Sequence, residues 1–290
     1  MSAALQIWEK NPVPQWLQGA WERPFICRGF PLGPRDTSVR VYYLQSPTLF
    51  IDIRQRTKNS SSPYNEKDFV AFAGVTKTRV DRSGIETVAW YAVHEYSSSW
   101  KSFNEENEDL FWKNLDEDKL TTEDVGVVDQ RTNVDWYEYP LDICDQEQKK
   151  ERWYQEFWCD RHKDNLQEEA VTIPWFAAKR KGGIIVLVGD YLSICDATRN
   201  LYVCLLREQG RWRITANSMS APRSSEESAT EERDLIAGSK ENGNPTENSL
   251  SISGIIDGLF NSRNQDEWSV MQGSCYKDFN ELSTAEGLHW

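Results

Sequence analysis

Short runs of apolar and aromatic residues recur along the chain and are separated by turn-forming residues. The clearest pair lies within residues 39–54, where two runs rich in β-branched and aromatic residues flank Ser46, Pro47 and Thr48. Such a pattern predicts a strand, a turn and a second strand. Similar runs predict further strands, at residues 21–28, 85–96, 124–131, 133–139, 152–159, 171–179, 184–195, 201–207 and 211–216.

The first hairpin predicts one apolar face and one charged face, since side chains alternate along a strand. If residues 46–48 form the loop, Tyr42 lies opposite Asp52, and Arg40 lies opposite Arg54. These four side chains would then share a face. Turned inward, this face would offer two guanidinium groups and one carboxylate, and so suit an acidic group of a ligand. Turned outward, it would be an ordinary surface ion pair.

This series of strands, joined mostly by short polar turns, predicts an all-β protein with an antiparallel up-and-down sheet. Closure into a β-barrel is favoured over a sandwich because closure removes the exposed edge strands. Helices are expected to be short and peripheral. The acidic segment 104–124 contains apolar residues at helical spacing, which is consistent with a short surface helix or an acidic loop.

Composition divides the chain into three parts. Residues 1–217 carry the predicted strands and form the expected barrel domain. Residues 218–251 are dominated by Ser, Glu, Asn, Gly and Pro, and we expect this insertion near the C-terminus to be disordered, since it has too little apolar surface to bury. Residues 252–290 regain some apolar character and are expected to pack on the barrel or form a tail.

Charge and cysteine content exclude several classes of protein. The 290-residue chain has a net charge of −13, which disfavours binding to nucleic acid and to anionic membranes. No apolar run is long enough to span a membrane, and no secretion signal is recognisable, so a cytosolic location is expected. Six cysteines without Cys-x-x-Cys spacing and only three histidines predict neither a metal site nor a disulfide framework. The common cofactor motifs are also absent, so no cofactor is expected.

Residues Gly19, Ala20 and Trp21, at the start of the first predicted strand, resemble the Gly-x-Trp signature of the lipocalin (calycin) family. The resemblance implies a lipocalin-like barrel in which Trp21 closes the floor and an arginine of the last strand packs over it. Arg213 is the matching arginine, with Arg211 as the second choice. The opening region, residues 19–54, is also similar to uncharacterised bacterial proteins with Trp-Leu-Gln and Asp-Ile-Arg elements. In this chain these elements read Tyr43-Leu44-Gln45 and Asp52-Ile53-Arg54.

Candidate catalytic groups lie in aromatic strands. His94 is the only histidine within a predicted strand, and alternation places it on one face with Trp90 and Tyr96. It would be the natural proton shuttle near neutral pH, or else an ordinary buried or surface histidine. Glu138 and Glu156 stand among the aromatic residues of two later strands. Lining a cavity, either would have a raised pKa and could act as a general acid, whereas facing outward it would be solvated.

Thirteen tryptophans can fill a core or line a cavity, and three hypotheses for function follow. The first is a barrel that binds a small hydrophobic molecule, with Trp136 among the lining residues together with those named above. The second is a cofactor-independent isomerase, cyclase or hydratase in which His94 or Glu95, together with Asp52 and Glu138, supplies acid and base. The third is a protein-interaction module that uses the acidic segment 104–124 or the segment 218–251.

Overall fold

The computed structural model describes a little over half of the chain. The described residues are 12–57, 69–80, 86–97, 104–122, 124–132, 134–141, 152–160, 175–209, 211–218 and 268–273. The predicted disordered segment 218–251 lies outside them except for Ser218, as does most of the segment 252–290. The division of the chain at residue 217 therefore stays a prediction.

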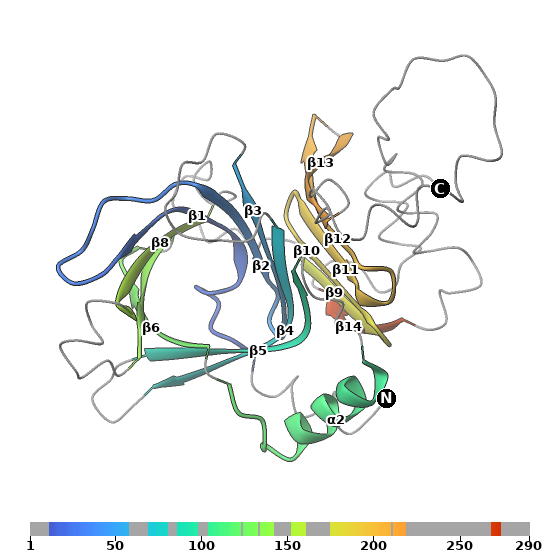
Figure 1. The fold of residues 1–290 in the computed structure, drawn as a ribbon. Helices are drawn as coiled ribbons and strands as arrows, with labels where there is room; N and C mark the ends of the chain where they lie inside the picture. Colours follow the sequence, from blue (N-terminus) through green and yellow to red (C-terminus); the bar gives the residue numbers. More distant parts are fainter. Residues whose placement is uncertain are drawn as a thin grey trace, which may run out of the picture.

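Eight antiparallel strands form a closed barrel (Figure 1), which confirms the predicted all-β, up-and-down fold. Each strand pairs with the next along the chain, and β1 also pairs with β8, so the sheet has no free edge. The barrel strands are β1 (Gly19–Arg28), β2 (Val39–Gln45), β3 (Leu49–Arg56), β4 (Phe69–Val80), β5 (Glu86–Ser97), β6 (Val125–Gln130), β7 (Asp135–Pro140) and β8 (Tyr154–Asp160).

The later strands do not enter the barrel, although their sequence pattern assigned them to it. They form a second antiparallel sheet in the order β13-β12-β11-β10-β9-β14. Its strands are β9 (Trp175–Arg180), β10 (Gly183–Val188), β11 (Tyr191–Asp196), β12 (Leu201–Glu208), β13 (Arg211–Asn217) and β14 (Ser269–Gly273), with a short 3₁₀ helix, η2 (Ala197–Arg199), before β12. Strands β10, β11 and β12 pack on the outside of β2 and β3 (Figure 1).

The first hairpin is one residue out of the predicted register. Tyr43, and not Tyr42, lies opposite Asp52, and Val41 lies opposite Arg54, because four residues and not three separate the paired Gln45 and Phe50. A shift of one residue moves side chains to the opposite face of a strand. Tyr43 therefore shares the inner face of the barrel with Asp52.

The outer face of the same hairpin is apolar and buried. Tyr42, Leu44, Ile51 and Ile53 belong to one hydrophobic cluster with residues of the second sheet such as Val186. Both faces of β2 and β3 are thus covered, one by the barrel interior and one by the second sheet. The hairpin therefore has one apolar face, as predicted, but the register changes its members, so that Arg40 and Tyr42 do not share a face with Asp52 and Arg54.

A β-bulge in β5, opposite β4, moves the side chains near the end of β5 to the opposite face of the sheet. Ala73 pairs with His94, while the next residue, Gly74, pairs with Ala92, so Val93 is extra. A Cβ on Gly74 would lie 2.0 Å from the carbonyl oxygen of Tyr91, which only glycine avoids. Beyond the bulge, residues expected inside the barrel point out of it.

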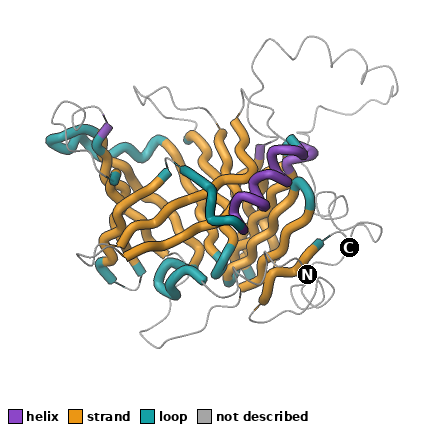
Figure 2. Tube along the Cα trace, turned by 90° about the horizontal axis from the view of Figure 1, so that it is seen from below, coloured by secondary structure: helices purple, strands orange, loops and turns teal. Residues whose placement is uncertain are grey.

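The acidic segment forms one helix, α2 (Glu105–Asp116), outside the barrel beside β5 (Figures 1 and 2). The Asn104 side chain caps its N-terminus by accepting hydrogen bonds from the backbone NH groups of Glu106 and Asn107. Buried Glu108 accepts a hydrogen bond of 2.9 Å from the backbone NH of Gly182, in the turn between β9 and β10. The helix therefore connects the barrel with the second sheet.

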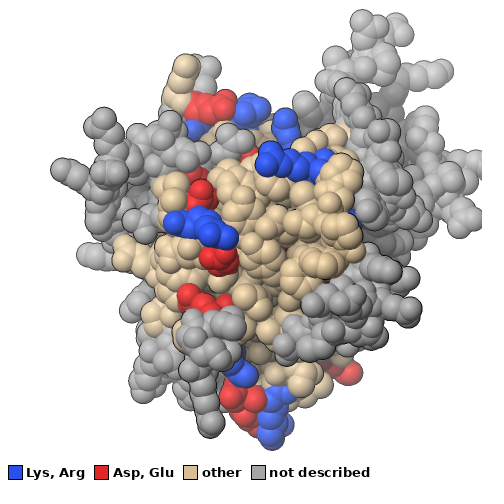
Figure 3. Space-filling model, turned by 90° about the vertical axis from the view of Figure 1, so that its left-hand side faces the viewer, with Lys and Arg blue, Asp and Glu red and all other residues tan. Residues whose placement is uncertain are grey.

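Acidic and basic side chains are interspersed on the described part of the face in Figure 3, around a broad uncharged area. None of the helices in the described part of the chain has the length and apolarity that a membrane crossing requires.

Candidate functional site

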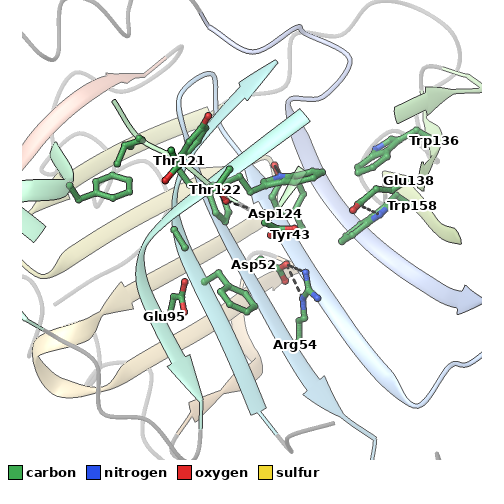
Figure 4. A pocket seen from close by; sticks show the side chains of 17 residues that line it. Tyr43, Asp52, Arg54, Glu95, Thr121, Thr122, Asp124, Trp136, Glu138 and Trp158 are labelled. Carbon is green, nitrogen blue, oxygen red and sulfur yellow. Dashed lines mark hydrogen bonds and ion pairs between the residues drawn. The ribbon is translucent and has the colours of Figure 1, made fainter. Parts of the chain in front are cut away.

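A cavity of about 290 Å³ lies within the barrel (Figure 4). Side chains of β2, β3, β4, β5, β7 and β8 form its walls. Phe111 of α2 also contributes to the lining, as do Leu120, Thr121, Thr122 and Asp124. The volume is close to the lower end of the range of about 300–1,000 Å³ found for small-molecule pockets. The site therefore has room for a small ligand.

One wall is built from aromatic rings. The indoles of Trp136 and Trp158 stack with their centroids 5.2 Å apart and an interplanar angle of 11°. Tyr43 meets Trp158 edge-on at 5.7 Å and accepts a hydrogen bond of 3.0 Å from Nε1 of Trp90. All four rings line the cavity. Pairing between rings holds them in fixed orientations, so the wall is preorganised.

Trp21 lies behind this wall. It contacts Trp136 edge-on at 5.7 Å, and its indole NH donates a hydrogen bond of 2.8 Å to the carbonyl of Leu17. Its neighbours Leu17 and Val13 precede β1 and are buried in the same cluster. Trp21 does not itself line the cavity.

Asp52 and Arg54 point into the cavity from β3 (Figure 4). Oδ2 of Asp52 accepts two hydrogen bonds from Arg54, of 3.0 Å from Nε and 2.7 Å from Nη2. The other two members of the predicted cluster, Arg40 and Tyr42, are placed on the outer face by the register of the hairpin. The expected pocket with two arginines is therefore not formed.

Glu138 projects into the cavity from β7 and is buried. Its carboxyl accepts hydrogen bonds of 2.9 Å from the Tyr154 hydroxyl and 3.2 Å from Nε1 of Trp158. Burial raises its pKa well above the ordinary value, and the negative charges of Glu156 and Asp124 raise it further. Burial and the neighbouring carboxyl groups therefore favour the protonated form of Glu138.

Glu156 lies next to this site but does not line it. Its carboxylate forms an ion pair and hydrogen bond with Nη1 of Arg23, from β1, and both side chains are buried. Arg23 was not singled out from the sequence. Two paired charges in the barrel interior hold β1 and β8 together at the seam where the barrel closes.

Asp124 and Glu95 add two carboxyl groups at the rim, where both keep access to water. Desolvation among the cavity walls raises the pKa of Asp124 to about 6, and the nearby Asp52 and Glu156 oppose the lowering effect of Arg54. Desolvation also raises the pKa of Glu95. Among the described residues, the cavity thus carries four carboxyl groups, with Asp52 and Glu138 included, and one arginine.

His94 lies outside the barrel, because it follows the bulge in β5. It is 3% exposed, with Nε2 3.7 Å from Oε1 of Glu108 on α2. Burial, together with the smaller effect of the Lys179 charge, lowers its pKa to about 4. The predicted catalytic set is thus divided: Asp52 and Glu138 line the cavity, and His94 does not.

The low pKa of His94 makes stability depend on pH. The unfolded chain binds the proton near pH 6.5 and the folded chain only near pH 4, so the contribution of His94 is present above pH 6.5 and is lost as the pH falls to 4. We expect a loss of up to about 3 kcal/mol over this window. Urea unfolding from pH 4.5 to 7.5 should show a shallower decline for His94→Gln than for the wild type. Equal pH dependence in both proteins would contradict this account.

The remaining predicted residues lie away from the cavity. Tyr96 packs between the barrel and the second sheet, with its ring 5.7 Å from Phe69 and 5.2 Å from Tyr202. Arg213 lies on β13, where it pairs with Glu208 and its side chain is 60% exposed. It does not lie in the barrel that contains Trp21, because its strand belongs to the second sheet.

Sequence reasoning missed several residues of the lining, among them Tyr43, Asp124, Trp158 and Phe72. Tyr43 and Trp158 lie in predicted strands, but the alternation of side chains does not show which of them point into the barrel. Asp124 was only one of many acids in its segment. Among the described residues, no cluster of three side chains is arranged to hold a metal ion.

No protein-family model, no curated protein and no solved structure matches this chain.

Proposed function

We propose that the barrel binds a small, largely apolar molecule within the cavity that Trp136 lines. The observation that carries the proposal is a preformed hollow of about 290 Å³ with stacked indoles on one side and a few fixed polar groups on the other. Ligand sites are typically concave, mainly apolar and supplied with a small number of oriented polar groups. The eight-stranded antiparallel barrel is compatible with this role and with a lipocalin-like fold.

Filling the cavity tests the proposal. Ala92 lines it from β5, so Ala92→Leu would occupy part of its volume, whereas Ala92→Ser keeps it open. We expect native mass spectrometry to find a small molecule bound to the wild type and to Ala92→Ser, and at least ten-fold less on Ala92→Leu. Circular dichroism would check that all three proteins are folded. A wild type that retains no added or co-purified molecule, or equal binding by Ala92→Leu, would contradict the proposal.

The second candidate is a cofactor-independent enzyme on the same site, an isomerase, cyclase or hydratase acting on a hydrophobic intermediate. It is favoured by Asp124 and Glu138, whose raised pKa values suit proton transfer near neutral pH. His94 is not part of this candidate, because it lies outside the cavity. Conversion of a bound compound by the wild type, lost in Glu138→Gln while the compound still binds, would favour this candidate over simple binding.

A further inference from the structure

The Asp52 carboxylate presents an oxygen that nothing in the described part of the chain uses. Asp52 is 5% exposed, and both hydrogen bonds from Arg54 end on Oδ2. Oδ1 is buried and accepts no hydrogen bond among the described residues. A buried acceptor without a partner destabilises the folded state, and more so when it is charged. A donor from a ligand in the cavity would remove this cost.

The charges of the cavity favour a positively charged donor. Among the described residues, the lining holds the carboxyl groups of Asp52, Glu95 and Asp124 against the one guanidinium of Arg54, a formal charge of −2 when all are ionised. Glu138 adds a fourth carboxyl group, whose raised pKa favours the neutral form. Beyond the lining, Glu156 is already neutralised by Arg23. An anionic ligand would meet net repulsion here, and a cation would meet net attraction.

The aromatic wall suits a cation as well. The faces of indole and phenol rings attract cations, most strongly where water is excluded. Rings from three sides line the cavity, including Trp90, Trp158 and Phe72. Arg54 already uses this chemistry, since its guanidinium carbon lies 5.3 Å from the centre of the Phe72 ring. The same rings provide the apolar surface for the body of the ligand.

A second unused polar atom, the indole nitrogen of Trp136, indicates an acceptor on the ligand or a bridging water. Trp136 is 1% exposed and lines the cavity, and its Nε1 makes no hydrogen bond among the described residues. An indole NH can only donate. The unused groups of the wall are thus one acceptor, on Asp52, and one donor, on Trp136.

From the unused Asp52 oxygen, the excess of carboxyl groups and the aromatic wall, we propose that the cavity selects an organic amine. The ligand is a protonated amine with at least one N–H, donated to Oδ1 of Asp52, on a small apolar or aromatic body. This inference rests on the proposed ligand-binding function and narrows it to one class of ligand. It replaces the expectation of an acidic ligand, which depended on Arg40 facing the same site.

Amine binding should compete with protons for the carboxyl groups. The titratable groups of the lining, among the described residues, are Asp52, Glu95, Asp124, Glu138, Tyr43 and Tyr91, with Arg54 as the opposing charge. The pKa of Asp124 is about 6, so this carboxyl becomes neutral as the pH falls through that value. Attraction for a cation then weakens.

The test compares three ligands of similar shape and different charge by isothermal titration calorimetry. The probes are phenethylamine, 2-phenylethanol and phenylacetate. At pH 7.5 we expect phenethylamine to bind at least ten-fold more tightly than the neutral and the anionic probe. Its affinity should fall by up to about ten-fold at pH 5.0, since protons then occupy Asp124. The N,N,N-trimethyl form lacks an N–H and should bind at least five-fold more weakly.

Asp52→Asn removes the charge at almost constant size and should abolish the preference for the amine. The matched control is Asp190→Asn, which removes a carboxylate paired with Arg207 on the second sheet, and the preference should persist in it. The comparison of probes on the wild type stands on its own if Asp52→Asn does not fold. Equal affinity for phenethylamine and 2-phenylethanol would overturn the amine inference and leave the proposed function intact. Failure of all three probes to bind would count against the proposed function itself.

Discussion

Replacing Trp21 by alanine is expected to lower the free energy of unfolding by about 3–5 kcal/mol, the usual cost of deleting a buried tryptophan side chain. Trp21 is 2% exposed, and the substitution removes both its edge-on contact with Trp136 and its hydrogen bond to the Leu17 carbonyl. Since Trp136 lines the cavity, the loss should also loosen the aromatic wall. Chemical denaturation followed by circular dichroism would measure the change.

Val80→Ala is the matched control, because Val80 lies at the end of β4 and is 65% exposed. We expect its effect to stay within about 0.5 kcal/mol, as for most surface substitutions. If Trp21→Ala were as mild as the control, Trp21 would not be a structural support of the barrel.

Arg23→Met is expected to cost about 3–5 kcal/mol, because it leaves Glu156 buried without its ionic partner. Adding Glu156→Leu should recover most of this loss, since replacing both members of a buried pair by apolar residues is often neutral. Urea unfolding of the two single variants and the double variant would give the coupling free energy between the residues.

The exposed pair of Arg213 and Glu208 provides the control for Arg23. Both side chains are more than half exposed, so Arg213→Met should change stability by no more than about 1 kcal/mol. Similar losses in Arg23→Met and Arg213→Met would show that burial of the first pair has no energetic consequence. That outcome would contradict the assignment of Arg23 to the seam between β1 and β8.

The candidate site was only partly accessible to prediction. Asp52, Arg54, Trp90, Trp136 and Glu138 were identified from strands of mixed charged and aromatic character, and all five line the cavity. The five residues shared a detectable signal, which is a polar or large aromatic side chain within an otherwise β-forming run.

His94 shows why the rest of the site could not be predicted. Strict alternation places it on one face with Trp90, but the bulge between Ala73 and Gly74 inserts one residue between them. The bulge depends on the close approach of Gly74 to the backbone of Tyr91, a contact between two strands that neither strand reveals alone. The predicted positions of Arg40 and Tyr42 were wrong for a related reason. The number of residues in the turn at 46–49 decides which side chains of the hairpin share a face.

The sequence by itself indicated most of the strands, the antiparallel fold and the closure of a barrel, because these follow from local β-propensity, from turn residues and from the need to pair strand edges. It did not predict β4, where helical turns were expected at residues 66–73, and it merged β10 and β11 into one strand. Only the tertiary structure decided where the barrel ends and which faces are enclosed. Strands β2 and β3 are buried on both sides, so their hydrophobic pattern does not distinguish the cavity from the contact with the second sheet. The charge of the cavity follows from that choice, since it placed Asp52 inside and Arg40 outside.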